Sequence, residues 1–444
     1  MVLAGRGLIY RAVRAAGAAG AALALAAVAP GAALASWTPG IVLNAPGSAG
    51  GGYSYATAVN RYGHTLFALG VLRQGAPGHW QVQVRTRSGN GVLGPLHAMS
   101  MPIPANDPPE PAAAVSDSGS GVVAWVTAQR VMAGLVSAAG KPGRVLTLSQ
   151  AVATAPSLLR VVMSPTGEAF VAWDGNQRLQ ARFISPAGKP GPVLSLGDGG
   201  LQMPQVAISR SGVVTVASTD ILGVQAVRVT PRRVSPTRLI ISTGGVTIHS
   251  VTAIADDTGG DTTFAIIAVR NLSNGGQQVS LMARDWYRGG TLGPAVRIAP
   301  RVDDWTSRVA VAAGQSGDSV LAWTDYAAGG KSYAYSRRFS PAGKLGPVVT
   351  LGTGFGPVAT LDPSGSGMVI WQSCVMPVPG ALPCPGPFLI WGRLVTATGA
   401  AFGRQFTLTS DGIYPVLGES WAGKLTAVWV QPTGSIPIRA RFGP

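Results

Sequence analysis

The sequence has 444 residues, of which 46% are hydrophobic and only 12% charged, and glycine and proline occupy 61 and 34 positions. Glycine and proline spread this densely exclude a chain built from long helices. The formal net charge of +16 at pH 7 indicates a partner that carries phosphates or acidic sugars, although part of this charge falls on an arginine that repeats along the chain.

The first 35 residues have the pattern of an export signal. Arg6, Arg11 and Arg14 precede an alanine-rich apolar run that ends at the small-residue site Ala33-Leu34-Ala35, and we predict cleavage before Ser36. No cysteine follows that site, so we expect no lipid anchor, and no later stretch is long and apolar enough to span a bilayer. The sequence therefore predicts a secreted, soluble protein.

The rest of the chain repeats a cassette about every 50 residues. Each unit has a short apolar strand, a tight glycine-containing turn, a second strand that often ends in Ala-Trp, a third strand that carries arginine, and a fourth strand. The segment at 116–125 returns in similar form at 164–173, and the turn at 185–189 returns letter for letter at 340–344. A period in this range, with four strands per unit, is typical of a β-propeller.

Aligned, the cassettes predict an all-β, eight-bladed β-propeller of four-stranded antiparallel blades, in one domain over 36–444. A weak fourth or fifth unit would reduce the count to seven blades. A row of immunoglobulin-like sandwiches is one alternative, but odd and even units would then differ, and they do not. A β-solenoid is the other, but its coils are shorter, about 20 to 30 residues. The blades are predicted near 56–100, 110–149, 156–197, 203–243, 249–299, 307–352, 356–409 and 414–444.

The last unit stops after its third strand, and the missing fourth strand is found at the other end of the chain. Residues 39–44 resemble the fourth strands at 191–196 and 346–351. We predict that this N-terminal strand completes the last blade, because ring closure removes exposed sheet edges.

With these repeats the chain resembles the secreted bacterial β-propeller repeat proteins, a broad class without one function. The segment Ser116-Asp117-Ser118-Gly119 is similar to the Asp-box of sialidases, but its spacing departs from that motif. The docking motifs of quinoprotein propellers and the calcium loops of integrin-like blades are absent from the sequence.

Cys374 and Cys384 flank a proline-rich insertion, and in an oxidising compartment we expect them to form a disulfide. Two further features repeat blade by blade and are interpreted as architectural, with tryptophans packed between blades and arginines over these rings or on carbonyl groups of the next blade. The tryptophans are Trp125, Trp173, Trp323, Trp371 and Trp429, and the arginines are Arg85, Arg182, Arg228, Arg284, Arg338, Arg393 and Arg441.

The sequence gives little support for a catalytic, metal or cofactor site. The four histidines lie in different units without metal-ligand spacing, so we predict no metal site. The Gly-x-Gly-x-x-Gly match at 89–94 joins two strands and opens no helix, and no other nucleotide or cofactor motif occurs, so we predict no cofactor.

We predict that a ligand binds on the face where second strands lead into third strands and blades connect. Aspartates and aromatic rings occur together in these loops, and stacking rings with hydroxyl-binding carboxylates suit a carbohydrate. The alternative is ordinary turn chemistry of aspartate. The candidate residues are Asp174, Asp220, Asp303, Asp304, Trp305, Asp325, Tyr326 and Asp411.

Three functions remain open. The first is an exported, non-enzymatic and monomeric scaffold that binds a glycan or an extracellular protein, with no specific nucleic acid partner. The second is a sialidase-like hydrolase or polysaccharide lyase that uses Asp303, Asp304 or Asp325. The third is adhesion to an anionic cell-surface polymer by the opposite face, which holds Lys141, Lys189, Lys344 and Lys424.

Overall fold

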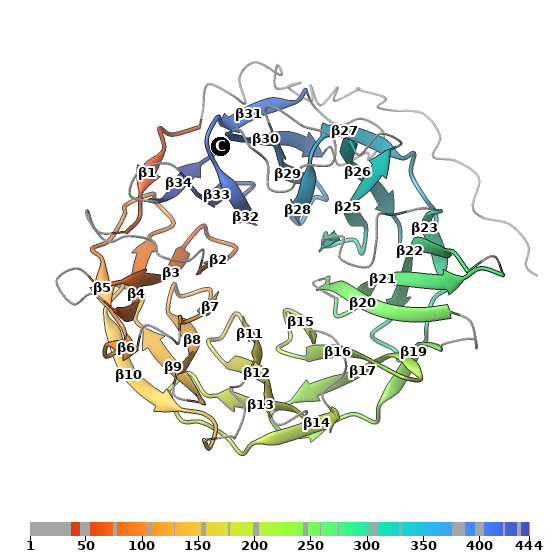
Figure 1. Cartoon of the computed structure of the whole chain (residues 1–444). Coiled ribbons are helices and arrows are strands. Elements are labelled where there is room, and N and C mark those ends of the chain that lie inside the picture. Colours follow the sequence, from red (N-terminus) through yellow and green to blue (C-terminus); the bar gives the residue numbers. More distant parts are fainter. Residues whose placement is uncertain are drawn as a thin grey trace, which may run out of the picture.

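The computed structural model is a ring of eight antiparallel β-sheets around one central axis (Figure 1). It describes residues 37–443 except 45–53, 74–77, 105–107, 128, 152–156, 176–177, 199–203, 243–246, 258, 274, 301, 303–308, 328–330, 375–386, 396–403, 421 and 433–436. None of the described residues forms a helix, so this part of the chain contains no helix that could cross a membrane. The prediction of an all-β, eight-bladed propeller is confirmed.

Each blade runs from an inner strand at the axis to an outer strand at the rim. Blade 1 consists of β2 (Tyr55–Val59), β3 (Thr65–Leu72) and β4 (His79–Arg87), with the short β5 (His97–Ala98) and β6 (Ile103–Pro104) both paired to β4. Blade 2 consists of β7 (Ala112–Val115), β8 (Gly121–Thr127), β9 (Arg130–Val136) and β10 (Pro142–Thr147). Blade 3 consists of β11 (Ser157–Met163), β12 (Ala169–Gly175), β13 (Arg178–Ile184) and β14 (Leu194–Asp198). Blade 4 consists of β15 (Gln205–Ile208), β16 (Val214–Asp220) and β17 (Gly223–Thr230), with β18 (Arg233–Val234) and β19 (Arg238–Ser242) both paired to β17.

The second half of the ring repeats this order. Blade 5 consists of β20 (Thr247–Asp256), β21 (Thr262–Asn271), β22 (Gln277–Trp286) and β23 (Val296–Ala299). Blade 6 consists of β24 (Ala310–Ala313), β25 (Ser319–Ala327), β26 (Lys331–Phe339) and β27 (Val349–Thr353). Blade 7 consists of β28 (Phe355–Leu361), β29 (Gly367–Cys374), β30 (Phe388–Val395) and β31 (Phe406–Thr409). Blade 8 consists of β32 (Ile413–Glu419), β33 (Leu425–Val430), β34 (Ile438–Phe442) and, from the other end of the chain, β1 (Ile41–Val42).

The inner two strands of every blade are joined by the same four-residue turn. In each turn the N–H of the fourth residue donates to the carbonyl oxygen of the first over 3.0–3.3 Å, as in Gly119 to Ser116 at 3.0 Å and Gly260 to Asp257 at 3.3 Å. The fourth residue is always a glycine with a φ between 73° and 94°, a region that other residues rarely enter. The turns begin at Asn60, Ser116, Ser164, Ser209, Asp257, Gly314, Asp362 and Ser420.

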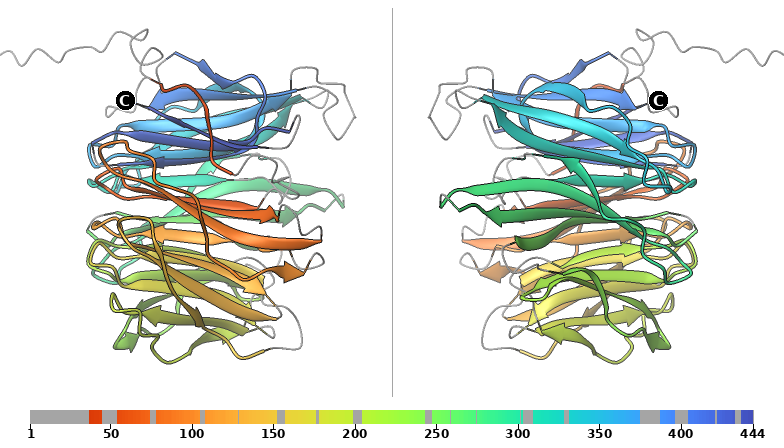
Figure 2. Two further views of the ribbon diagram at one scale, coloured as in Figure 1. Left: turned by 90° about the vertical axis from the view of Figure 1, so that its left-hand side faces the viewer. Right: turned by 90° about the vertical axis from the view of Figure 1, so that its right-hand side faces the viewer.

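These turns define the two faces of the disc, which Figure 2 shows from the side. We call the face that carries them, together with the turns between third and fourth strands, the turn face. The opposite face carries the connections between second and third strands and those between blades, and we call it the loop face. The predicted ligand residues belong to the loop face.

The core is divided into eight clusters, and each cluster lies between two neighbouring blades. The repeated tryptophans are at most 2% exposed and occupy five of these clusters, so the prediction that they pack between blades is confirmed. A fully buried aromatic side chain of this kind contributes on the order of 2–3 kcal/mol.

The repeated arginines connect neighbouring blades: in six blades the guanidinium donates to a carbonyl of the preceding blade's outer segment, and not of the next blade as predicted. Arg337, for example, donates to Gly346 O of its own blade at 2.7 Å and to Ile298 O of blade 5 at 2.8 Å. The same contact to the preceding blade is made by Arg85, Arg182, Arg284, Arg393 and Arg441.

The predicted register of this arginine was wrong in two blades. In blade 6 the equivalent residue is Arg337, opposite Leu321, rather than Arg338, which instead pairs with Asp318 at 3.6 Å. In blade 4 Arg228 is displaced by one position, lies over the Trp286 ring at 4.1 Å and binds carbonyls of the following blade. Adjacent residues of a strand point to opposite sides of the sheet, so a shift of one residue changes the partner.

The ring closes as predicted, with β1 paired to β34. Ile41 lies opposite Ala440, Leu43 N–H donates to Ile438 O at 2.8 Å, and Thr38 N–H donates to Phe442 O at 2.9 Å. Neither a row of sandwiches nor a seven-bladed ring is observed, because the fourth and fifth units are both complete blades.

The export signal at 1–35 and Cys384 lie outside the described residues. Cys374 is the last residue of β29. The disulfide between Cys374 and Cys384 therefore stays a prediction.

Candidate ligand site at the channel mouth

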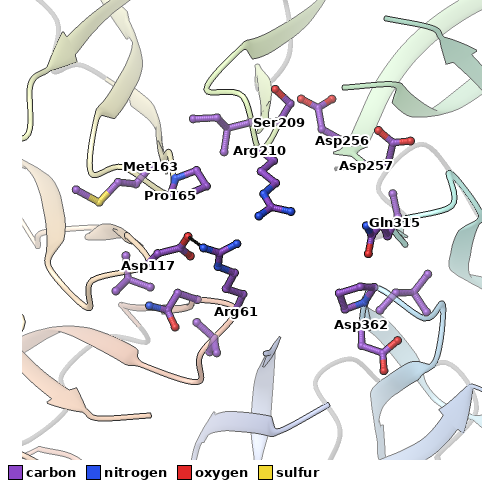
Figure 3. A pocket seen from close by; sticks show the side chains of 17 residues that line it. Arg61, Asp117, Met163, Pro165, Ser209, Arg210, Asp256, Asp257, Gln315 and Asp362 are labelled. Atoms are coloured by element: carbon purple, nitrogen blue, oxygen red, sulfur yellow. Dashed lines mark ion pairs between the residues drawn. The ribbon is translucent and has the colours of Figure 1, made fainter. Parts of the chain in front are cut away.

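A cavity of about 280 Å³ lies where the central channel opens on the turn face (Figure 3). Its walls come from the turns that join first and second strands and from the inner-strand residues just before them, in seven of the eight blades. The repeat therefore brings equivalent positions of distant segments to one place at the axis.

The second residue of the turn faces this mouth and differs from blade to blade. Within the described residues that line the cavity, this position holds Arg61, Asp117, Pro165, Arg210, Gln315 and Pro363. Figure 3 shows the side chains of Arg61 and Arg210 extending toward the middle of the mouth. The backbone of the turn is constant, whereas the chemistry that it presents to the channel is not.

One side of the mouth carries a charge pair between blades 1 and 2. Arg61 Nη2 lies 2.6 Å from Asp117 Oδ2. Burial raises the pKa of Asp117, while the positive charges of Arg61 and Arg210 act to lower it. Because two guanidinium groups lie near a single carboxylate, the net charge on this side of the mouth is positive.

The other side carries Asp256 at a position that is otherwise mostly apolar. The last residue of the inner strand is Val59, Val115, Met163, Ile208, Ala313 or Leu361 in six other blades. Thr262 Oγ1 donates to Asp256 Oδ1 at 2.5 Å and lies 3.0 Å from Thr215 Oγ1. Burial raises the pKa of Asp256 to about 7, because the apolar surroundings disfavour the charged form.

Asp257 follows directly and begins the turn of blade 5. Its Oδ1 accepts hydrogen bonds from Gly260 N–H at 2.7 Å and Asp261 N–H at 2.9 Å. The side chain is 8% exposed, and burial raises its pKa. Asp257 therefore shapes the turn, and with Asp256 and Asp362 it makes this side of the mouth acidic.

Glu419 occupies in blade 8 the position that Asp256 occupies in blade 5, the last residue of the inner strand. Burial and, to a smaller extent, the negative charge of Asp362 raise the pKa of Glu419 to about 8. Among the described residues its buried Oε2 has no hydrogen-bond partner.

The predicted ligand residues that the structure describes lie at the loop face, away from this cavity. Asp220 accepts hydrogen bonds from Leu222 N–H at 2.8 Å and from Gln225 Nε2 at 2.6 Å, which is turn chemistry. Asp411 accepts from Gln431 Nε2 at 3.1 Å. Burial raises the pKa of Asp174, and the negative charge of Asp325 contributes to raising the pKa of Tyr335.

The remaining predicted residues cannot be placed in a site. Asp303, Asp304 and Trp305 lie outside the described residues, and of Tyr326 only the backbone, in β25, is described. The structure thus does not gather the predicted set in one cavity, and its role in binding stays a prediction.

The sequence prediction did not include the residues at the mouth, because it rested on aspartates and aromatic rings that occur together in the loops of the other face. A signal was present: comparison of the eight turns at their second position, and of the residue before each turn, singles out Arg61, Arg210 and Asp256. Within the described part of the chain no three His, Cys, Asp or Glu side chains are grouped so that they could hold a metal ion.

No family model and no curated protein matches this sequence. A solved prolyl endopeptidase is similar in structure, with a TM-score of 0.47 and 13% identity over 87% of this chain and 55% of that one. The chain thus spans about half the length of that enzyme. A protein of unknown function from Dyadobacter fermentans gives a TM-score of 0.42 and 12% identity over 92% of this chain and 98% of that one. Polysaccharide lyase Uly1 gives 0.46 and 9% identity over 73% and 87%, and similarities this low assign no function to this chain.

Proposed function

We propose that this protein is an exported, non-enzymatic binding module that holds a unit of a glycan at the channel mouth on the turn face. The supporting observation is the break in the repeat. Eight turns keep one backbone path, yet the side chains that they direct to the axis differ and include Arg61, Asp117, Arg210 and Gln315. A turn that served the scaffold alone would need no such differences at one position.

The two sides of the mouth suit a sugar that carries an acidic group. Guanidinium groups bind carboxylate or sulfate oxygens through paired N–H donors, and Arg61 and Arg210 extend into the mouth. Asp256 and Asp362 on the other side can accept hydrogen bonds from sugar hydroxyls. The volume of about 280 Å³ is small for a ligand pocket and fits a single unit or the end of a longer chain.

A hydrolase or lyase remains the second candidate, and one observation favours it. A carboxyl group whose pKa is about 7, as for Asp256, is suited to donate a proton near neutral pH. Release of new reducing ends or of unsaturated sugars from a bound glycan would establish this alternative.

The proposal is tested by titrating the mature protein with short neutral, carboxylated and sulfated oligosaccharides in a calorimeter. Arg210→Ala should weaken binding of the acidic members by about tenfold or more, because a charge-assisted hydrogen bond to the ligand is lost. Arg178→Ala removes an exposed arginine from the loop face and should leave binding unchanged. Absence of saturable binding, or equal affinity of the Arg210→Ala variant, would contradict the proposal.

Export, a location outside the cell and a monomeric state belong to the same proposal and rest on the sequence. N-terminal sequencing of the mature protein should begin at Ser36, and light scattering should give the mass of one chain.

A further inference from the structure

Negatively and positively charged side chains differ in how deeply they are buried in this molecule. Among the residues whose side chains are described, Glu110, on the loop face, is the one exposed carboxylate, and every other such acid is at least partly buried. Lysine and arginine side chains, in contrast, are exposed at many positions. The excess of positive charge in the sequence is therefore concentrated at the surface.

On the turn face these cations form a continuous series. The turn between the third and fourth strands carries at least one exposed cation in each of five consecutive blades, from blade 2 to blade 6. We call this series the cationic arc, and it consists of Lys141, Lys189, Arg232, Arg233, Arg288 and Lys344.

Three of the lysines are held by the same turn. Lys141 N–H donates to Ser137 Oγ at 3.1 Å, and Lys189 and Lys344 donate in the same way to Ser185 Oγ at 3.1 Å and Ser340 Oγ at 3.2 Å. The backbone under each lysine is thus fixed, while its long side chain stays exposed to solvent. Such a site offers a positioned positive charge to a partner at little cost in backbone order.

Acids on the turn face do not neutralise the arc. Glu168 is partly buried, Asp261 accepts the backbone N–H of Arg288 at 2.5 Å, and Asp318 lies 3.6 Å from Arg338. No ion pair within the described residues involves a member of the arc.

We propose that the cationic arc binds an anionic polysaccharide that runs along the rim of the turn face. The proposal deepens the proposed function and rests on it, because the same polymer would place one acidic unit in the channel mouth. Its sulfate or carboxylate groups would contact cations of successive blades, and released counterions would supply much of the free energy of binding. A row of cations supplied by rigid, repeated turns matches a ligand that itself repeats.

The test compares two variants with the same change in charge. The arc variant carries Lys141→Gln, Lys189→Gln, Arg288→Gln and Lys344→Gln, and the control carries Arg130→Gln, Arg178→Gln, Arg270→Gln and Lys331→Gln on the loop face. The probes are heparin, which is sulfated, and polygalacturonate, which carries only carboxylates. Dissociation constants are measured at two salt concentrations, and circular dichroism verifies that both variants are folded.

The affinity of the unmodified protein should fall about 50- to 130-fold between 50 and 200 mM salt if four or five charges are contacted, with the slope of about 0.7 per charge of a single-stranded polyanion. The arc variant should bind at least about tenfold more weakly at low salt and depend less on salt, whereas the control should keep its affinity. Preference for one probe identifies sulfate or carboxylate as the recognised group. Equal losses in both variants, unchanged binding by the arc variant, or equally tight binding of duplex DNA would overturn the proposal.

The proposals for the channel mouth and for the cationic arc can be refuted separately. Arg210→Ala should reduce binding of short acidic oligosaccharides and leave most of the affinity for the polymer, and the arc variant should do the reverse. Loss of polymer binding in the Arg210→Ala variant alone would place recognition in the mouth and refute the arc.

Discussion

At the scale of single residues, the most informative positions are the carboxyl groups that the fold withdraws from water. Asp256 and Glu419 end inner strands at a position that is otherwise mostly apolar, and burial raises their pKa values to about 7 and about 8. Asp285 behaves alike, since burial raises its pKa to about 7 while it accepts a hydrogen bond from Thr263 Oγ1 at 2.8 Å. These groups tie the stability of the ring to protonation.

This link predicts that the protein loses stability as the pH rises. The folded-state pKa of Asp256, about 7, lies above the value of about 3.9 for an unfolded chain, so the folded state holds more protons in between. Each such group lowers the free energy of unfolding by up to about 1.4 kcal/mol per pH unit across its window and leaves it unchanged below both pKa values. Asp256→Asn should flatten the decline between pH 4 and pH 7 and make the variant the more stable form at pH 8.

Urea unfolding curves recorded from pH 4 to pH 8.5 check this prediction. Glu110→Gln, at an exposed carboxylate, is the matched control and should follow the unmodified protein. Parallel curves for Asp256→Asn and the unmodified protein would show that burial of this carboxyl group does not govern the pH dependence.

At the scale of elements, neighbouring blades are joined by apolar clusters and by the guanidinium contacts between them. A charged donor that satisfies two carbonyls fixes the spacing of two sheets, whereas the tryptophans contribute large buried apolar surfaces to five of the clusters. In six blades this arginine has the same register, so part of the positive charge of the sequence serves the contacts between blades.

Arg337→Ala should destabilise the protein by about 2–3 kcal/mol, because it leaves the carbonyls of Ile298 and Gly346 without their charged donor. Arg337→Lys should recover only part of this loss, since an ammonium group lacks the planar fork that reaches both oxygens. Arg297→Ala, at an exposed position of the neighbouring β23, should change stability by less than about 0.5 kcal/mol. Thermal unfolding of the three variants decides, and equal effects of Arg337→Ala and Arg297→Ala would refute the assignment.

At the scale of the whole molecule, the fold could be predicted because the sequence signals for it are short motifs that recur in every blade. The period, the turn glycines and the leftover strand at 39–44 each predict the same ring. The candidate site could not be predicted in the same way, because Arg61, Arg210 and Asp256 are far apart in sequence and meet only at the axis. The loop-face aspartates were favoured by composition, yet Asp220 and Asp411 are engaged in local hydrogen bonds.

Closure of the ring predicts a strong effect of a small truncation. A chain that begins at residue 45 lacks β1 and leaves β34 as an exposed edge, and it also lacks Trp37 and the fully buried Leu43. We expect a lower melting temperature and concentration-dependent association, relative to a chain that begins at Ser36. Light scattering and thermal unfolding test this, and a truncated chain that is monomeric with an unchanged melting temperature would contradict it.

The same closure sets an order of events during synthesis. The segment that completes blade 8 is made before the strands of blade 1, but its partner Ile438–Phe442 is made after those of blade 7, so β1 must wait until seven other blades have been synthesised. A long strand that stays unpaired during synthesis can pair with the wrong sheet edge. Because β1 has only two residues, its pairing with a wrong edge is weak, and β1 pairs stably only when blade 8 is in place.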